Sequence, residues 1–191
     1  MQVDYKRLKQ AVETTVRELA TGSKAPVRRP VVETRVLRDL QGEVTAGPYR
    51  FRTDAARDAG GFGEHPRPMD YLLGALASCQ QMWCLRWAAL REIHFTDLVI
   101  EAEAVFSWRG EYLQETDSGI AEIRVTYRVD GDRIVAAVIC EMADMVAARC
   151  PVLATLRRSV PIREQIVVAG RTVAVREWKP GYEQALRASR I

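Results

Sequence analysis

Residues 68–79 read PMDYLLGALASC, from Pro68 to Cys79, and they open the longest helical pattern in the chain. We expect this helix to run from about Met69 to Ile93. Apolar residues run almost all the way round its first half, a pattern that is typical of a core helix. The sequence therefore predicts a long helix that is either deeply buried or part of a subunit interface.

Two of the cysteines stand in marked settings. Cys79 lies inside the long apolar helix, and Cys150 directly precedes Pro151 at the expected start of a short helix. A thiolate that attacks a peroxide or a disulfide forms a sulfur species that needs a second sulfur to close it. A nucleophile with a resolving partner, and hence thiol redox chemistry, is the first hypothesis.

Activation of Cys79 requires a cation. The residue lies roughly ten positions inside its helix, and the helix dipole acts only over the first turn. Without a nearby charge, a buried cysteine behaves as a small hydrophobic core residue. The candidates are Arg86, on the same helix face, and Arg35 or Arg38 from the first pair of strands.

Cys150 has its own source of activation in the sequence. Proline is favoured at the first turn of a helix, so the residue before it commonly caps that helix. The free N–H groups there favour a thiolate; the alternative is that Cys150 merely starts a turn. Cys84 and Cys140 carry no comparable feature and are expected in the core.

The order of elements predicts an α+β fold. The expected elements are a helix over 4–20, strands over 31–38 and 43–52 joined across Gln41-Gly42 with an interruption at Gly47-Pro48, an irregular glycine-rich loop over 54–68, the helix over 69–93, strands over 96–109 and 120–129, a helix over 133–148, a short helix to residue 158, strands over 162–168 and 172–178, and a short exposed helix over 179–191. Strands come mostly as consecutive pairs, which favours α+β over a doubly wound parallel sheet.

Composition narrows the functional classes. The chain has 191 residues, 48% of them apolar, which suffices for one substantial core. The net charge of +3 comes without a long basic block, so we expect no nucleic-acid partner. The N-terminus has no apolar signal segment and no apolar run is long enough to span a bilayer, so we expect a cytosolic protein without a membrane partner. Four cysteines and two histidines form neither a disulfide scaffold nor a spacing suited to zinc.

A set of residues spread over the chain resembles the OsmC/Ohr family, the osmotically induced protein C and organic hydroperoxide resistance proteins, in its broader OsmC-like branch. The residues that carry the resemblance are Asp54, Gly60-Gly61, Gly63, Pro66, Pro68-Met69-Asp70, the run from Leu72 to Cys79, and Cys150-Pro151-Val152. The similarity covers roughly residues 30–168.

The resemblance implies an α+β fold in which two chains intertwine as a homodimer, with long central helices wrapped by antiparallel-rich β-sheets and active sites at the subunit interface. Residues 29–178 would form the OsmC-like domain. Residues 1–28 would be an N-terminal amphipathic helix and linker, and residues 179–191 a C-terminal tail.

The resemblance also implies a reaction. The protein would reduce organic hydroperoxides, or hydrogen peroxide, without a metal or other cofactor, using Cys79 as the peroxidatic and Cys150 as the resolving thiol. The apolar residues on the Cys79 face favour organic substrates. A dithiol such as a lipoylated protein would be the reductant.

In this family an arginine of the first hairpin stabilises the thiolate and is held by a glutamate shortly before the cysteine. We assign the first role to Arg38 rather than Arg35. Met69 stands where the hydroperoxide-resistance branch has that glutamate, and Asp70 follows. Asp70 would serve either as an acid at the helix N-terminus or as the partner of the arginine.

Two other functions fit the same residues. The Met69 departure and the Trp83/Trp87 pair are compatible with a non-enzymatic dimer that binds a hydrophobic small molecule between its subunits. Cys79 would also suit a thiol–disulfide or persulfide enzyme, which accepts a disulfide or persulfide instead of a peroxide.

Overall fold

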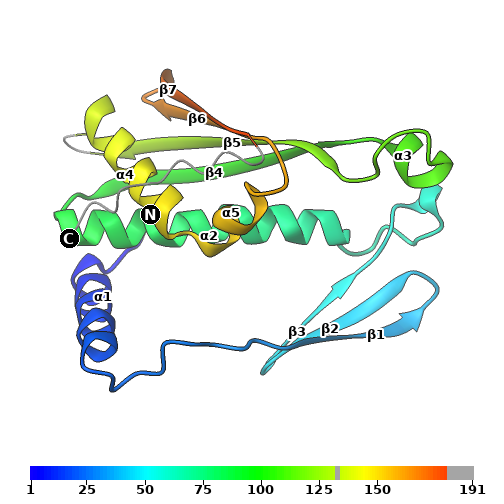
Figure 1. Ribbon diagram of the computed structural model, residues 1–191, viewed down its shortest axis with the longest axis horizontal. Coiled ribbons are helices and arrows are strands. Elements are labelled where there is room, and N and C mark those ends of the chain that lie inside the picture. Colours follow the sequence, from blue (N-terminus) through cyan, green and yellow to red (C-terminus); the bar gives the residue numbers. More distant parts are fainter. Residues whose placement is uncertain (132–133, 180–191) are drawn as a thin grey trace. The chain divides into compact units, whose positions relative to one another are not determined.

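The structure, a computed structural model, describes residues 1–131 and 134–179 (Figure 1). Its helices are α1 (Tyr5–Ala20), α2 (Pro68–Arg91), α3 (Trp108–Leu113), α4 (Ala136–Arg149) and α5 (Pro151–Leu156), with a 3-10 turn η1 (Arg57–Ala59). Its strands are β1 (Val32–Arg38), β2 (Gln41–Ala46), β3 (Tyr49–Thr53), β4 (Phe95–Phe106), β5 (Ile120–Gly131), β6 (Ile162–Val168) and β7 (Arg171–Trp178). The mixed α+β fold confirms the sequence prediction.

The chain forms two compact units. One contains residues 1–13 together with the chain from residue 75 onward, and the other contains residues 14–74. The helix predicted over residues 179–191 falls almost entirely outside the described residues, as does Arg133 at the predicted start of α4.

The sheet of the smaller unit has the strand order β1-β2-β3, with both pairs antiparallel. The predicted turn at Gln41-Gly42 is wrong, because Arg38 pairs with Gln41 and the chain reverses over Asp39 and Leu40. Asp39 adopts the left-handed region (φ 43°), which aspartate tolerates better than most residues. Gly47, at φ 60°, makes a second full turn between β2 and β3, so the expected hairpin is a three-stranded meander.

The sheet of the larger unit has the order β4-β5-β6-β7. β5 and β6 are parallel because α4 and α5 carry the chain back across the sheet, and the other two pairs are antiparallel. The strand predicted over 96–109 is too long at its end, because β4 stops at Phe106. The side chain of Ser107 accepts a hydrogen bond from the N–H of Gly110 and so caps helix α3, which the sequence did not predict.

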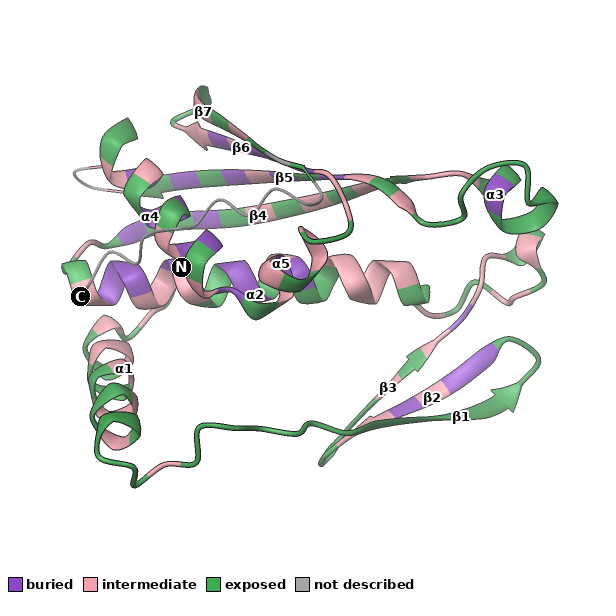
Figure 2. Ribbon diagram, in the orientation of Figure 1, coloured by how far each residue is buried: buried purple, intermediate pink, exposed green. Residues whose placement is uncertain are grey.

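The core of the larger unit lies between this sheet and its helices. β5 alternates buried and exposed residues, and its bands are visible in Figure 2; Ile123, Val125, Tyr127 and Val129 form the buried face. α2 contributes a buried stripe from Leu76 to Ala89, whereas Met82 on another face is half exposed. Within the single chain α2 is therefore a core helix on one side only.

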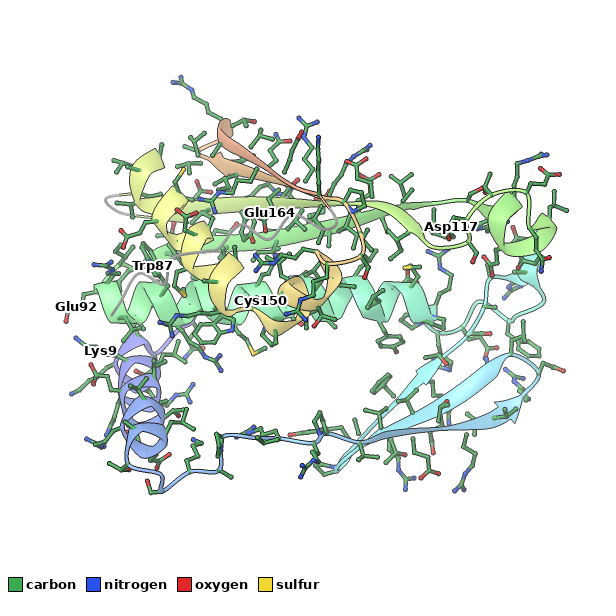
Figure 3. All side chains as sticks on the ribbon, viewed as in Figure 1. Lys9, Trp87, Glu92, Asp117, Cys150 and Glu164 are labelled. Carbon is green, nitrogen blue, oxygen red and sulfur yellow. The ribbon has the colours of Figure 1, made fainter. Side chains whose placement is uncertain are left out.

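The N-terminal helix is present as predicted, and its first turns are fixed to the α2–β4 connection. Lys9 forms an ion pair with Glu92 at 2.7 Å, and Figure 3 labels both residues. The Tyr5 hydroxyl accepts a hydrogen bond from the Phe95 N–H at 2.9 Å, and its ring lies against that of His94. In the described ranges, none of the helices combines the length and apolar character needed to cross a bilayer.

Candidate active site

The two marked cysteines lie in contact. The thiol of Cys150 donates a hydrogen bond to the Sγ of Cys79, with the sulfur atoms 3.1 Å apart. Both residues are buried in the larger unit, and neither forms a disulfide. An S–S bond is about 2.05 Å long, so a shift of about 1 Å between the sulfur atoms would allow the bond to form.

Cys150 lies at the junction of α4 and α5, where Figure 3 labels it. It ends α4 and caps α5, and its Sγ accepts a hydrogen bond from the Leu153 N–H at 3.5 Å. The predicted cap is therefore present, but the predicted thiolate is not favoured. Burial raises the pKa of Cys150 to about 12, because loss of water outweighs the hydrogen bond from Leu153.

Cys79 is held in the middle of α2 beside Leu76, which is fully buried. Arg86, one of the three candidate cations, lies with its guanidinium over the ring of Trp83, 4.8 Å from the centroid, instead of donating to Cys79. Arg149 approaches the same ring at 5.8 Å. Trp83, on the same helix as Cys79, therefore has two guanidinium groups near its ring.

In the smaller unit, Arg38 is the centre of a polar cluster. Its Nη2 donates to Glu64 at 2.6 Å and its Nε donates to Gln41 at 2.9 Å. The guanidinium also lies 3.9 Å from the ring centroid of Phe62. Arg35, the alternative, is exposed, and its guanidinium lies 3.7 Å from the carboxylate of Glu33. Arg38 is thus the arginine of the first strand whose position is fixed.

The glycine-rich loop is organised around the buried carboxylate of Asp54. This group accepts hydrogen bonds from the side chain of Gln41 and from the N–H groups of Ala55, Phe62 and Glu64. Burial raises its pKa, but the four donors together overcome that effect and hold the pKa well below the usual range. Gly61 is required in this loop because a Cβ there would collide with the backbone of Ala55.

Glu64 is a member of the cluster that sequence reasoning did not select. Its carboxylate accepts from Gln41 as well as from Arg38, and the hydrogen bond from Gln41 followed by that from Arg38 lowers its pKa. No periodicity marks Glu64 or Gln41, since they meet across 23 residues. The only signal was the position of Glu64 in the glycine-rich loop.

Asp70 lies in the first turn of α2. It accepts hydrogen bonds from the backbone N–H and the guanidinium of Arg67, and these lower its pKa. A carboxylate that satisfies an N–H at a helix start is a capping contact. Among the described residues of the smaller unit, Arg38 takes its carboxylate contact from Glu64 and not from Asp70. Asp70 thus has the position of a helix N-terminal acid, and its role in a reaction stays a prediction.

The described part of the chain contains no cluster of histidine, cysteine and acidic residues that could hold a metal ion.

Comparison with known proteins identifies similar proteins by sequence and by fold. A family model described as OsmC-like protein matches residues 61–165, which is more than half of the chain. No curated protein matches the chain.

Solved structures share the fold. An OsmC-like protein from Mycoplasma pneumoniae superimposes with a TM-score of 0.65 at 18% identity, over 74% of this chain and 97% of its own. An organic hydroperoxide resistance protein OsmC from Legionella pneumophila gives 0.59 at 16% identity, over 76% and 100%. An organic hydroperoxide resistance protein from Elizabethkingia anophelis gives 0.60 at 11% identity, over 76% and 99%.

Proposed function

The chain belongs to the OsmC-like protein family, and from that premise we propose that it is a thiol-dependent peroxidase that reduces organic hydroperoxides to alcohols. The observation that carries the proposal is the 3.1 Å contact between the sulfur atoms of Cys79 and Cys150. Two thiols 71 residues apart in sequence, in contact and unbonded, form a pair that can be oxidised without rearranging the chain.

In the proposed reaction the Cys79 thiolate attacks the terminal oxygen of the hydroperoxide. The O–O bond breaks, and the departing alkoxide takes up a proton to become the alcohol. Cys79 is left as a sulfenic acid. Cys150 gives up its proton and attacks that sulfur as the thiolate, so that a disulfide forms and the hydroxyl group leaves with the proton as water. An external dithiol, such as a lipoylated protein, restores both thiols.

The two thiols divide these roles by their surroundings. Burial keeps Cys150 protonated at neutral pH, and because the thiolate is the attacking form, Cys150 does not serve as the thiol that attacks the hydroperoxide. In the proposal it therefore takes the second, resolving step. Cys79 then takes the first step, and its helix supplies no cation of its own because Arg86 faces Trp83. We propose that Arg38 supplies this charge in the assembled protein.

Arg38 is suited to that role by its support. Gln41 and Glu64 fix its guanidinium by two hydrogen bonds, and Asp54 in turn fixes Gln41 and the backbone of Glu64. A cation held in place by such contacts stabilises developing charge without reorganising. Asp70 contributes by fixing the start of the helix that carries Cys79.

Membership of this family supports a further proposal about assembly and location. We propose a cytosolic homodimer in which residues 29–178 form the OsmC-like domain. Exposed apolar residues in each unit support a partner surface: Val32 and Val36 on β1 are 59% and 75% exposed, and Met82 on α2 is 49% exposed. Met82, an apolar residue of the Cys79 helix that is about half exposed, favours an organic substrate over hydrogen peroxide.

The decisive experiment treats the reduced protein with one equivalent of cumene hydroperoxide and maps its disulfides by peptide mass spectrometry. We expect a Cys79–Cys150 disulfide, with cumyl alcohol formed in equal amount. Cys79→Ser should abolish both, whereas Cys140→Ser, which removes a partly buried thiol outside the pair, should change neither. Consumption of hydroperoxide by Cys79→Ser at the wild-type rate would refute the assignment.

The sulfur contact also suits a second reaction, thiol–disulfide or persulfide exchange at Cys79. The same mapping with a small disulfide and with a persulfide separates the two. A rate constant for either that exceeds the rate constant for cumene hydroperoxide would replace the peroxidase by an exchange enzyme.

A further inference from the structure

The carboxyl group of Glu164 is buried on β6, in the sheet of the larger unit. The residues of β6 alternate, and the inward row consists of Ile162, Glu164 and Ile166, all with at most 1% of their surface exposed. Burial of a carboxyl group is unfavourable unless hydrogen bonds compensate. A glutamate between two isoleucines on a buried face therefore has to be compensated by hydrogen bonds, and its retention there points to a role beyond packing.

Glu164 joins three elements through one oxygen. Its Oε1 accepts a hydrogen bond from the Tyr127 hydroxyl of β5 at 3.1 Å and another from the Gln80 Nε2 of α2 at 3.2 Å. All three side chains are fully buried. Burial and the nearby charge of Glu164 raise the pKa of Tyr127, so its hydroxyl keeps the proton that it donates.

These contacts connect the two segments that carry the thiols. Gln80 directly follows Cys79 on α2, so a hydrogen bond that holds Gln80 also limits rotation of the helix at Cys79. β6, which carries Glu164, follows α5, the helix that Cys150 caps. Figure 3 labels Cys150 and Glu164 in this part of the larger unit.

The segment between α5 and β6 is itself fixed. The Arg157 guanidinium donates to the carbonyl of Ala147 at the end of α4, and the carbonyl of Pro161 accepts from the N–H of Ile123 on β5 at 2.9 Å. The route from Cys150 to Glu164 thus has little freedom. The Glu164–Gln80 hydrogen bond then connects β6, and with it the segment that follows Cys150, to the helix that carries Cys79.

Disulfide formation is sensitive to such positioning. The two sulfur atoms must move from 3.1 Å to bonding distance with a restricted dihedral angle. Effective concentrations of paired groups fall steeply when the geometry loosens. An apolar side chain at position 164 would fill the core without a buried charge. A protein with such a replacement is often at least as stable against unfolding as the original.

We propose that Glu164 is a positioning residue: through Gln80 it holds Cys79 against Cys150 in the geometry that disulfide formation requires. The inference deepens the proposed function, since that disulfide is the oxidised state of the proposed cycle.

The test measures the equilibrium constant of the Cys79–Cys150 disulfide in glutathione redox buffers. Glu164→Leu and Gln80→Leu each remove the Gln80–Glu164 hydrogen bond, whereas Glu164→Gln keeps an oxygen that can accept it. Gln165→Leu is the matched control, because Gln165 is the next residue of β6 and contacts Thr172 instead of the core cluster.

We expect Glu164→Leu and Gln80→Leu to lower the equilibrium constant by about tenfold or more, and Glu164→Gln to restore it to within about threefold of wild type. Gln165→Leu should leave it unchanged. A merely structural role would destabilise the reduced and oxidised forms equally and leave the constant unchanged in every variant that folds, and that result would overturn the proposal. If Glu164→Leu does not fold, Gln80→Leu decides alone.

A second readout follows the oxidised protein after cumene hydroperoxide. In Glu164→Leu, the fraction of Cys79 that dimedone traps as sulfenic acid should rise at the expense of the disulfide. The glutathione equilibrium involves no hydroperoxide, so it separates the two proposals. A wild type that reduces no hydroperoxide, together with a lowered constant in Glu164→Leu, refutes the peroxidase and supports the positioning role; an active wild type with an unchanged constant refutes the positioning role alone.

Discussion

The sulfur of Cys150 lies 3.1 Å from that of Cys79, at the one residue that both ends α4 and begins α5. The N–H of Leu153 fixes this sulfur, yet burial raises the pKa of Cys150 to about 12. A helix start that would activate an exposed thiol here only orients a buried one. Cys150 is therefore a buried, protonated thiol, and this is the basis on which we propose it as the resolving partner of Cys79.

Cys150→Ser tests that division. We expect the first reaction with cumene hydroperoxide to keep its rate to within about threefold, because Cys79 is unchanged, while turnover with a dithiol falls by about tenfold or more. Cys79 sulfenic acid should accumulate and be trapped by dimedone in intact-protein mass spectra. Full turnover by Cys150→Ser, supported by a disulfide between Cys79 and Cys84, would contradict the role of Cys150.

Arg38→Met tests the cation. If Arg38 stabilises the charge on the reacting sulfur, its loss should slow the first reaction with hydroperoxide by about a hundredfold, as loss of one charge-stabilising donor does elsewhere. Stopped-flow tryptophan fluorescence measures this rate. Arg35→Met is the matched control, because Arg35 lies on the same strand, is exposed, and among the described residues forms an ion pair only with Glu33. Equal rates in the two variants would remove Arg38 from the mechanism.

Glu64→Gln and Asp70→Asn separate the two acidic residues near the start of α2. Glu64 contacts Arg38, so Glu64→Gln should slow the hydroperoxide reaction by about tenfold, in keeping with the loss of a charged partner. Asp70 contacts only Arg67 among the described residues, so Asp70→Asn should leave the rate within about twofold and lower the free energy of unfolding by about 0.5 kcal/mol. The reverse pattern would return the arginine-partner role to Asp70.

The acid limb of stability depends on Asp54. Its folded-state pKa lies below the ordinary value of 3.8, so its ionised form stabilises the fold above that pH, and this contribution disappears as the pH falls below 3.8 toward the folded-state value. Asp54→Asn should lower the thermal midpoint by several degrees at pH 7, and the gap from wild type should narrow as the pH falls toward 2.5.

Asp58→Asn controls for a carboxylate in the same loop, since Asp58 is exposed. It should track the wild type across the pH range. A constant gap between Asp54→Asn and wild type from pH 7 to 2.5 would show that the Asp54 charge contributes nothing to folding.

The sequence was most informative where local pattern and burial coincide. The alternation in β5 and the apolar run of α2 marked their buried residues, and the cysteine motif marked the thiol pair. The glycine at position 42 predicts a chain reversal at Gln41-Gly42. The reversal lies instead at Asp39-Leu40, because Asp39 adopts the left-handed conformation that is usually taken by glycine. The role of Glu64 could not be predicted, because it contacts Arg38 across 26 residues and no periodic pattern in the sequence indicates such a contact. Glu164 was visible in principle, since a period of two from Ile162 to Ile166 places it inward.

The alkaline limb of stability distinguishes the reduced protein from its disulfide form. The folded-state pKa of Cys150 lies above its ordinary value of 9.0, so its thiol stabilises the fold below about pH 9, and this contribution is lost as the pH rises from 9 toward 12. In the disulfide form Cys150 has no proton to lose. We therefore measure the free energy of unfolding in urea between pH 7 and 10.5. It should fall more steeply with pH for the reduced protein than for the disulfide form, and the difference in slope should be at most about 1.4 kcal/mol per pH unit for one proton. Cys84 and Tyr127, whose pKa values burial also raises, titrate in both forms and cancel in the difference. Parallel curves for the two forms would show that Cys150 does not stabilise the fold as a buried, protonated thiol.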